Sequence, residues 1–317
     1  MRLFDSHAHL DDEKFSQDRE ELINTIKESD TTNFISAGYS IEGSIKALEL
    51  ARKYSFIYAT VGISPNDIPQ SEERILEDIQ KIENLIQEEL KIENIEKLEN
   101  AISIDKAEQI KKFEQNENKT DAEELKKNSI NENVINKNIE SGINKRKKLV
   151  AIGEIGLDYY WEKDEKMKEL QRVAFIKQIE LANRYDFPIV IHTRDAVMDT
   201  LDILKNNEVK KKGVFHCCPQ NRELIKEALK LGFYISFAGP ITFKNSKNAD
   251  EMINLVPNDR LLIETDSPYL APEPVRGTRN DPRNVKYIAE KIANVKNISL
   301  EDVANFTFSN VKKIFGI

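Results

Sequence analysis

The sequence has little cysteine. Its 317 residues include two cysteines, Cys217 and Cys218, and these are adjacent. Two neighbouring thiols cannot join distant parts of a chain, and alone they cannot supply the ligands of a structural zinc site. We therefore expect both to be reduced, half-buried thiols.

Long apolar segments are also missing. No run approaches the roughly 18 consecutive apolar residues that a membrane-spanning helix requires. The first residues, MRLFDSHAHL, lack the apolar core and the cleavage site of a signal peptide. We expect a cytoplasmic protein, monomeric and without membrane contact.

Acidic side chains outnumber basic ones. The chain has 47 Lys and Arg against 55 Asp and Glu, a formal net charge of −8. This balance argues against a protein that binds nucleic acid through a broad basic surface. A polyanionic substrate would need positive charge supplied locally, for example by metal ions.

Eight short apolar runs predict buried parallel strands, because most are continuously apolar rather than alternating. Amphipathic segments with helical spacing lie between them, such as residues 167–186 and 221–232, the second ending at Gly232. This alternation predicts an α/β fold, a (β/α)8 TIM barrel. The runs are residues 2–9, 33–38, 56–64, 149–158, 188–193, 213–217, 233–239 and 261–267.

One connection, residues 78–147 between the third and fourth predicted strands, is much longer than the others. The stretch 75–102 keeps apolar residues three or four positions apart and predicts a helix. From Glu114 to Asn144 the pattern gives way to an Asn-rich polar tract that cannot bury enough apolar area to order itself. We interpret the segment as a charged, partly helical insertion in a single barrel of residues 1–317, solvated rather than partner-binding. A mobile lid or a partner-binding arm is the alternative.

All four histidines follow or end apolar runs. In DSHAH, residues 5–9, the strand period of two directs His7 and His9 to one face, where both imidazoles can reach one metal ion. Asp5 can then accept a hydrogen bond from a ring nitrogen that does not bind the ion. A single histidine on an apolar strand is more often a packed core residue, so the metal interpretation depends on further ligands.

Further candidate ligands lie near the carboxyl ends of four other predicted strands: Glu154, His192, His216 and Asp266. In a barrel those strand ends meet at one mouth. Carboxylates buried there need positive charge, which metal ions supply. Four imidazoles and two carboxylates exceed what one tetrahedral ion takes, and they predict two divalent cations about 3.5–4 Å apart. Such ligands accept Mg, Mn or Zn.

Several motifs, in the same order along the chain, resemble the TatD family of metal-dependent deoxyribonucleases, within the amidohydrolase-type barrels. They are FDSHAHLDDEKF, VAIGEIGLDYYW, IVIHTRDA, VFHCC, FYISFAGPITFKN and LLIETDSPYLAPEPVRGTRNDP. The resemblance covers nearly the whole chain except residues 78–147.

The resemblance implies a role for each ligand. His7 and His9 would hold one ion. His192 and His216 would hold the second ion. Glu154 would bridge the ions, while Asp266 would bind the first ion and orient or deprotonate the attacking water. The family's metal ions produce hydroxide near neutral pH, which attacks phosphorus. The activity implied is hydrolysis of DNA phosphodiester bonds, as an exonuclease among the esterases of class EC 3.1.

Two departures from the family pattern concern the substrate rather than the metal ligands. Where the family reads VGIHP, this chain has VGISPN, which puts Ser64 where a histidine near the substrate phosphate is expected. Where the family reads FHCFSG, this chain has FHCCPQN.

Arginine and aromatic side chains are further candidates for substrate contacts. Arg194 and Arg276 can bind phosphate, because a guanidinium pairs with it bidentately, although salt bridges between loops would also explain them. Tyr159, Tyr160 and Trp161 can stack on exposed bases or pack at the barrel rim.

Two other functions fit the same motifs. A metal-activated water attacks carbonyl carbon as readily as phosphorus, so an ester or amide hydrolase such as a D-aminoacyl-tRNA deacylase is one alternative. A non-catalytic scaffold that binds a partner through the insertion is the other, although a degenerate scaffold would be expected to lose some of the six ligands.

Overall fold

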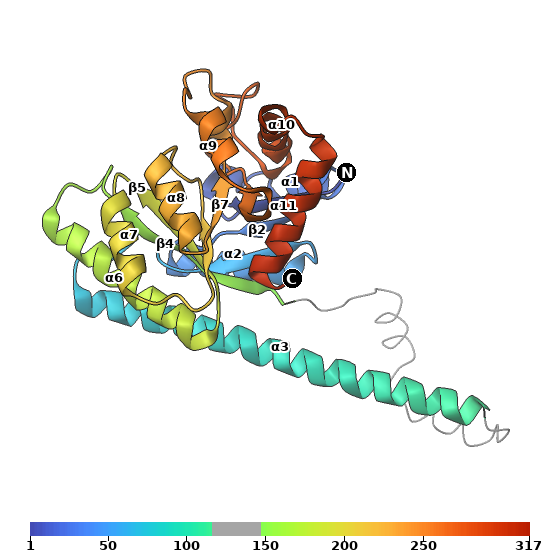
Figure 1. Ribbon diagram of the computed structural model, residues 1–317. Coiled ribbons are helices and arrows are strands. Elements are labelled where there is room, and N and C mark those ends of the chain that lie inside the picture. Colours follow the sequence, from blue (N-terminus) through green and yellow to red (C-terminus); the bar gives the residue numbers. More distant parts are fainter. Residues whose placement is uncertain (116–146) are drawn as a thin grey trace. The chain divides into compact units, whose positions relative to one another are not determined.

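The computed structural model describes residues 1–115 and 147–317, with side chains described up to Ile95 in the helix that ends at Gln115. Eight parallel strands form one sheet in chain order, and helices separate them, which confirms the (β/α)8 prediction (Figure 1). The strands are β1 (Leu3–Ala8), β2 (Thr31–Ser36), β3 (Ile57–Val61), β4 (Leu149–Asp158), β5 (Ile189–Arg194), β6 (Gly213–Phe215), β7 (Tyr234–Phe237) and β8 (Leu261–Ile263).

The sheet meets itself where the end of β1 lies beside the segment that follows β8. The main-chain N–H of His9 donates to the carbonyl of Ser267 at 2.7 Å, and the N–H of Asp266 donates to the carbonyl of His7 at 2.9 Å. Ala8 and Ser267 form a parallel bridge. This junction brings two sequence-distant groups of candidate ligands to the same place.

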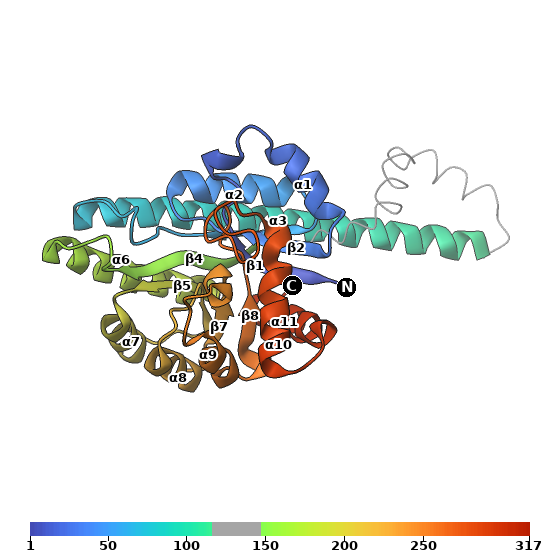
Figure 2. The ribbon, with the colours of Figure 1, turned by 90° about the horizontal axis from the view of Figure 1, so that it is seen from above.

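Helices surround the strands of the barrel, with α7, α8 and α9 on one side of the sheet and α1 and α2 on the opposite side (Figure 2). Side chains fix several helix starts: Asp164 accepts main-chain N–H groups at the start of α6, and Asn221 does so for α8. The helices are α1 (Arg19–Lys27), α2 (Ile41–Lys53), α3 (Glu72–Gln115), α6 (Glu165–Tyr185), α7 (Val197–Asn206), α8 (Arg222–Lys230), α9 (Ala249–Leu255), α10 (Val285–Lys296) and α11 (Leu300–Phe315).

An apolar cluster of the strands and α11, which we call the lower core, fills the barrel interior away from the mouth. Every strand contributes to it, and from α11 Phe308, Val311, Ile314 and Phe315 pack against the strand side chains. Such layers of branched and aromatic side chains make a barrel interior a packed core rather than a pore. The strand residues are Phe4, Ile35, Tyr58, Val150, Ala151, Val190, Val214, Tyr234 and Leu262.

The long connection between β3 and β4 contains α3, which includes the helix expected at residues 75–102. The chain divides into two compact units, residues 1–86 with 148–317, and residues 87–147. In the first unit Ile75, Ile82 and Ile86 are fully buried, and Glu83 accepts hydrogen bonds from Arg184 and Tyr185. The beginning of α3 is therefore part of the barrel's packing.

The Asn-rich tract predicted from Glu114 to Asn144 lies, but for its first two residues, outside the described residues, so its solvation and any partner stay predictions. Within the described residues, no helix combines the length and the apolar character needed to cross a membrane.

Candidate metal centre

The first pair of predicted ligands lies at the end of β1. The Nε2 atoms of His7 and His9 are 3.1 Å apart. The other ring nitrogen of His9, Nδ1, is 3.2 Å from the carbonyl oxygen of Ala37, so it acts as the donor, and the neutral ring keeps its lone pair on Nε2. The structure thus brings the two imidazoles together as the strand spacing predicts.

Asp266 joins this pair from the turn that follows β8. Its backbone is left-handed, with φ of 55°, a conformation that Asp tolerates better than most residues. Its Oδ1 is 3.4 Å from Nε2 of His9 and 3.7 Å from Nε2 of His7.

The second pair comes from β5 and from the residue after β6. Nδ1 of His192 is 3.1 Å from Nε2 of His216. The outward nitrogens of both rings face carboxylates: Nε2 of His192 lies 3.1 Å from Oδ2 of Asp158, and Nδ1 of His216 lies 3.4 Å from Oε1 of Glu264. Each imidazole therefore directs one nitrogen inward and has an acidic group behind it, an arrangement typical of metal-binding histidines.

Glu154, from β4, lies between the two pairs. Its Oε2 is 3.4 Å from Nε2 of His7 and 3.6 Å from Nε2 of His9. Its Oε1 is 2.9 Å from Nδ1 of His192 and 3.2 Å from Nε2 of His216. One carboxylate thus presents one oxygen to each histidine pair.

The donor set suits divalent cations. Within each of three groups, every residue offers a ligand atom within 4.8 Å of the others: His7, His9 and Glu154; Glu154, His192 and His216; His7, His216 and Asp266. In both histidine pairs two ring nitrogens face each other at 3.1 Å, a contact that needs a proton or a cation between the lone pairs. Imidazole and carboxylate together are ligands that Zn, Mn and similar ions accept.

The charges in this cluster depend on one another. Burial would raise the pKa of the Glu154 carboxyl, but the surrounding imidazoles, His216 first, hold that pKa well below its ordinary value. Burial lowers the pKa of His9, yet Asp266 and Glu154 raise it to about 9. For His7, burial and the neighbouring His216 outweigh the carboxylate of Glu154 and lower the pKa. Without a cation the carboxylates raise the pKa of His9, His192 and His216, so binding a metal must release the protons that these rings hold.

Two acidic residues of the site, Asp158 and Glu264, were not among the predicted ligands. Both are buried and face the outward nitrogens of His192 and His216. Glu264 also accepts the main-chain N–H of Cys217 at 2.6 Å. The signal was present in the sequence, because each is a carboxylate near the end of an apolar strand run, the feature that singled out Glu154 and Asp266.

The role expected of Asp5 is wrong. Its oxygens accept the N–H of Thr265 at 2.9 Å, the hydroxyl of Thr265 at 2.5 Å and the N–H of His7 at 3.2 Å. Asp5 therefore fastens β1 to the segment after β8 and contacts no imidazole nitrogen among the described residues.

A cavity of about 710 Å³ opens above the cluster. It is lined by five of the six predicted ligands, His7 excepted, and by Ser64, Arg194 and Trp161. Ser64 is buried, and its hydroxyl donates to Oδ2 of Asp67 at 2.6 Å. Arg194 is exposed, with its guanidinium carbon 3.7 Å from the ring centre of Tyr160. Both residues thus line the cavity, and their role as substrate contacts stays a prediction.

Other predicted contacts lie apart from this cavity. Arg276 stacks its guanidinium on the ring of Phe243 at 4.0 Å and does not line the cavity, so a phosphate contact there stays a prediction. The hydroxyl of Tyr159 donates to Asp199 and accepts from Arg172, which makes Tyr159 a packing residue. Both cysteines are free thiols, as expected.

Comparisons with known proteins identify the family of the chain. The family profile described as TatD related DNase matches residues 4–98 and 102–316. The match runs through most of residues 78–147, so the expectation that the resemblance stops there is wrong. The chain is 36% identical over 316 residues to YabD of Bacillus subtilis (strain 168), covering 99% of each chain, and that protein is named as a metal-dependent hydrolase.

A similarly named hydrolase of Buchnera aphidicola, BU355, is 32% identical over 321 residues and is matched along its whole length. Among solved structures, YJJV, a TatD homologue from Escherichia coli K12, superposes with a TM-score of 0.71 at 22% identity, covering 100% of this chain and 98% of that one. With matches of this extent, the chain belongs to the TatD family of metal-dependent hydrolases.

Proposed function

We propose that this protein is a two-metal phosphodiesterase that hydrolyses DNA and removes nucleotides from strand ends. The position of Glu154 carries the proposal, because its two oxygens each face one histidine pair. A single carboxylate between two sets of ligands is an arrangement that suits a pair of divalent cations. The family name, TatD related DNase, supports DNA as the substrate.

The chain's own residues would divide the work of hydrolysis. Two divalent cations in the cluster would supply Lewis acidity at the phosphodiester and lower the pKa of a water molecule. Asp266 lines the cavity and would orient that water and accept its proton as the water oxygen attacks phosphorus. The bond from phosphorus to the leaving oxygen then breaks, and that oxygen takes up a proton from solvent.

Substrate binding would rely on a small area of positive charge. Arg194 is exposed at the cavity wall, and its guanidinium can donate two parallel hydrogen bonds to a phosphate. The neutral Ser64 hydroxyl lies beside the acidic Asp67 and adds no charge. An acidic protein can thus hold a nucleic acid at the reacting phosphate without a broad basic surface.

A substrate panel tests the proposal. The purified chain, stripped of metal and reloaded separately with Mg, Mn or Zn, is given single-stranded DNA, duplex DNA, RNA and D-aminoacyl-tRNA. We expect release of mononucleotides from DNA that stops when a chelator is added. Cleavage of the aminoacyl ester with DNA left intact would move the function to carbonyl hydrolysis, and no turnover with any metal would contradict a hydrolytic role.

A further inference from the structure

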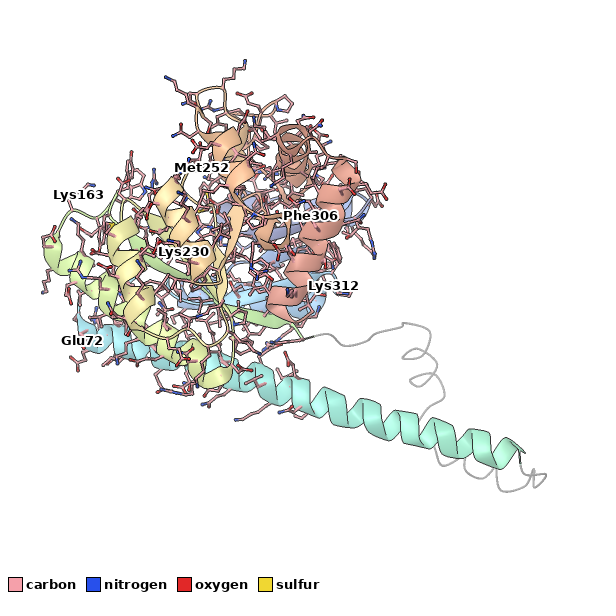
Figure 3. The ribbon with its side chains drawn as sticks, in the orientation of Figure 1. Glu72, Lys163, Lys230, Met252, Phe306 and Lys312 are labelled. Atoms are coloured by element: carbon pink, nitrogen blue, oxygen red, sulfur yellow. The ribbon has the colours of Figure 1, made fainter. Side chains whose placement is uncertain are left out.

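The turn between β4 and α6 carries two exposed aromatic side chains, Tyr160 and Trp161, and the second of them lines the cavity. Lys163, labelled in Figure 3, belongs to the same loop. Trp161 is 68% exposed and lines the cavity together with the ligand residues His9 and Glu154. Burial in a core therefore does not explain this large apolar side chain.

One carboxylate fixes the position of this turn. Oδ1 of Asp158 accepts the main-chain N–H of Tyr160 at 2.9 Å and that of Trp161 at 3.2 Å. Oδ2 of the same carboxylate lies 3.1 Å from Nε2 of His192. Asp158 therefore links the positions of the two aromatic residues to that of the predicted metal ligand His192.

The two rings have different surroundings. The guanidinium of Arg194 covers a face of Tyr160, 3.7 Å from the ring centre. The ring of Trp161 stands nearly perpendicular to that of Tyr160, at 86° with centres 4.7 Å apart, and its centre is 5.5 Å from the same guanidinium. Within the described residues, the guanidinium of Arg194 contacts the rings of Tyr160 and Trp161. A cation and an open aromatic face therefore lie side by side at the mouth of the cavity.

We propose that Trp161 is the stacking surface for an unpaired nucleobase beside the phosphate under attack, with Arg194 binding a phosphate of the same strand. This inference rests on the proposed function and names a part of its substrate. A base in a duplex has both faces covered by its neighbours, so stacking on Trp161 requires a single strand or a frayed end. The site therefore favours unpaired DNA and accepts any base, because every base offers an aromatic face.

The experiment uses the fact that Trp161 is the single tryptophan of the chain. The metal-loaded protein is titrated with a single-stranded oligothymidylate made resistant to cleavage by phosphorothioate linkages. We expect the tryptophan fluorescence to be quenched by this strand, and to change little with a strand of the same length and charge built from abasic residues. Equal quenching by both strands would overturn the inference, because charge alone would then explain binding.

Steady-state kinetics on cleavable single-stranded DNA give the second readout. Trp161→Ala should raise KM about tenfold with kcat changed little, because a stacked base contributes equally to the ground and transition states. Trp161→Phe keeps a stacking ring and should restore most of the affinity. Met198→Ala, which removes another exposed apolar side chain from a different cavity, is the matched control and should leave KM unchanged.

The outcomes separate the inference from the proposed function. If the wild-type protein cleaves DNA and Trp161→Ala has the wild-type KM, the base site is wrong and the phosphodiesterase stands. If the wild-type protein cleaves no DNA, the phosphodiesterase falls, and a base-dependent quenching of Trp161 would still support the nucleobase site.

Discussion

The two ends of the barrel are built from the same strands and differ completely in chemistry. β1 places Phe4 in the lower core and His7 in the ligand cluster, and β5 does the same with Val190 and His192. A few residues along one strand thus separate a purely apolar layer from a layer of imidazoles and carboxylates. The comparison teaches that stability and chemistry are assigned to different ends of each strand.

The energetics of the two ends also differ. Apolar side chains in the lower core stabilise the fold by leaving water, about 25 cal/mol for each Å² buried. Buried carboxylates and imidazoles at the mouth cost free energy unless they are paired or bind a cation. Changes in the lower core should therefore affect unfolding, and changes at the mouth should affect metal binding and turnover.

The largest expected effect is on stability, at the lower core. Phe4 packs against Tyr58 and Phe308, with ring centres 5.9 and 5.6 Å apart, so Phe4→Ala leaves a cavity. We expect the free energy of unfolding to fall by about 3–5 kcal/mol, measured by urea unfolding. Turnover per folded molecule should be unchanged. If Phe4→Ala had wild-type stability and reduced turnover, the assignment of stability to the lower core and of chemistry to the mouth would be wrong.

The next effect is on catalysis, at the mouth. Asp266→Asn keeps the volume of the side chain and removes the charge that would hold a cation and accept a proton. DNA hydrolysis should fall at least about 100-fold, while circular dichroism stays that of the wild type. Thermal stability should fall by no more than the stabilisation that the bound metal contributed. Asp202→Asn, the same change at an exposed position of α7, is the control and should have wild-type turnover.

The sequence predicts more of the ligand cluster than of its surroundings. The six predicted ligands follow from strand ends that meet at one mouth, a property of the fold that needs no knowledge of side-chain contacts. Asp158 and Glu264 also lie near strand ends, but the histidines that they face are 34 and 48 positions away in the chain, so the sequence marks these carboxylates and not their contacts. The same limit explains Asp5, whose true partner, Thr265, is brought near by the junction of β1 and β8.

A smaller effect is expected from the carboxylate of Asp158, which faces the outward ring nitrogen of His192. Asp158→Asn keeps an oxygen for the N–H groups of Tyr160 and Trp161 but loses the negative charge behind His192. We expect metal affinity or turnover to fall about tenfold, measured by metal titration. Asp199→Asn, which alters the carboxylate that accepts the hydroxyl of Tyr159 outside the cavity, should leave metal affinity unchanged. Equal losses in both variants would mean that Asp158 acts only on local packing.

The smallest effect is expected from the long connection. Ile82 and Ile86 are buried in the unit that contains the barrel, so a deletion that leaves the barrel intact must begin after them. Replacing residues 87–146 by a short Gly/Ser linker should leave metal-dependent turnover within about tenfold, because no candidate ligand lies in that segment. A folded deletion variant that binds metal and does not turn over would show that the segment shapes the active site.

The central claim, a pair of cations joined by Glu154, is tested most directly by anomalous scattering from crystals grown with Mn²⁺. We predict two peaks at the carboxyl ends of the strands, about 3.5–4 Å apart, with one oxygen of Glu154 as a ligand to each. The histidine pairs His7 with His9 and His192 with His216 should each bind one of the ions. A single peak, or two peaks of which Glu154 binds only one, would contradict the account.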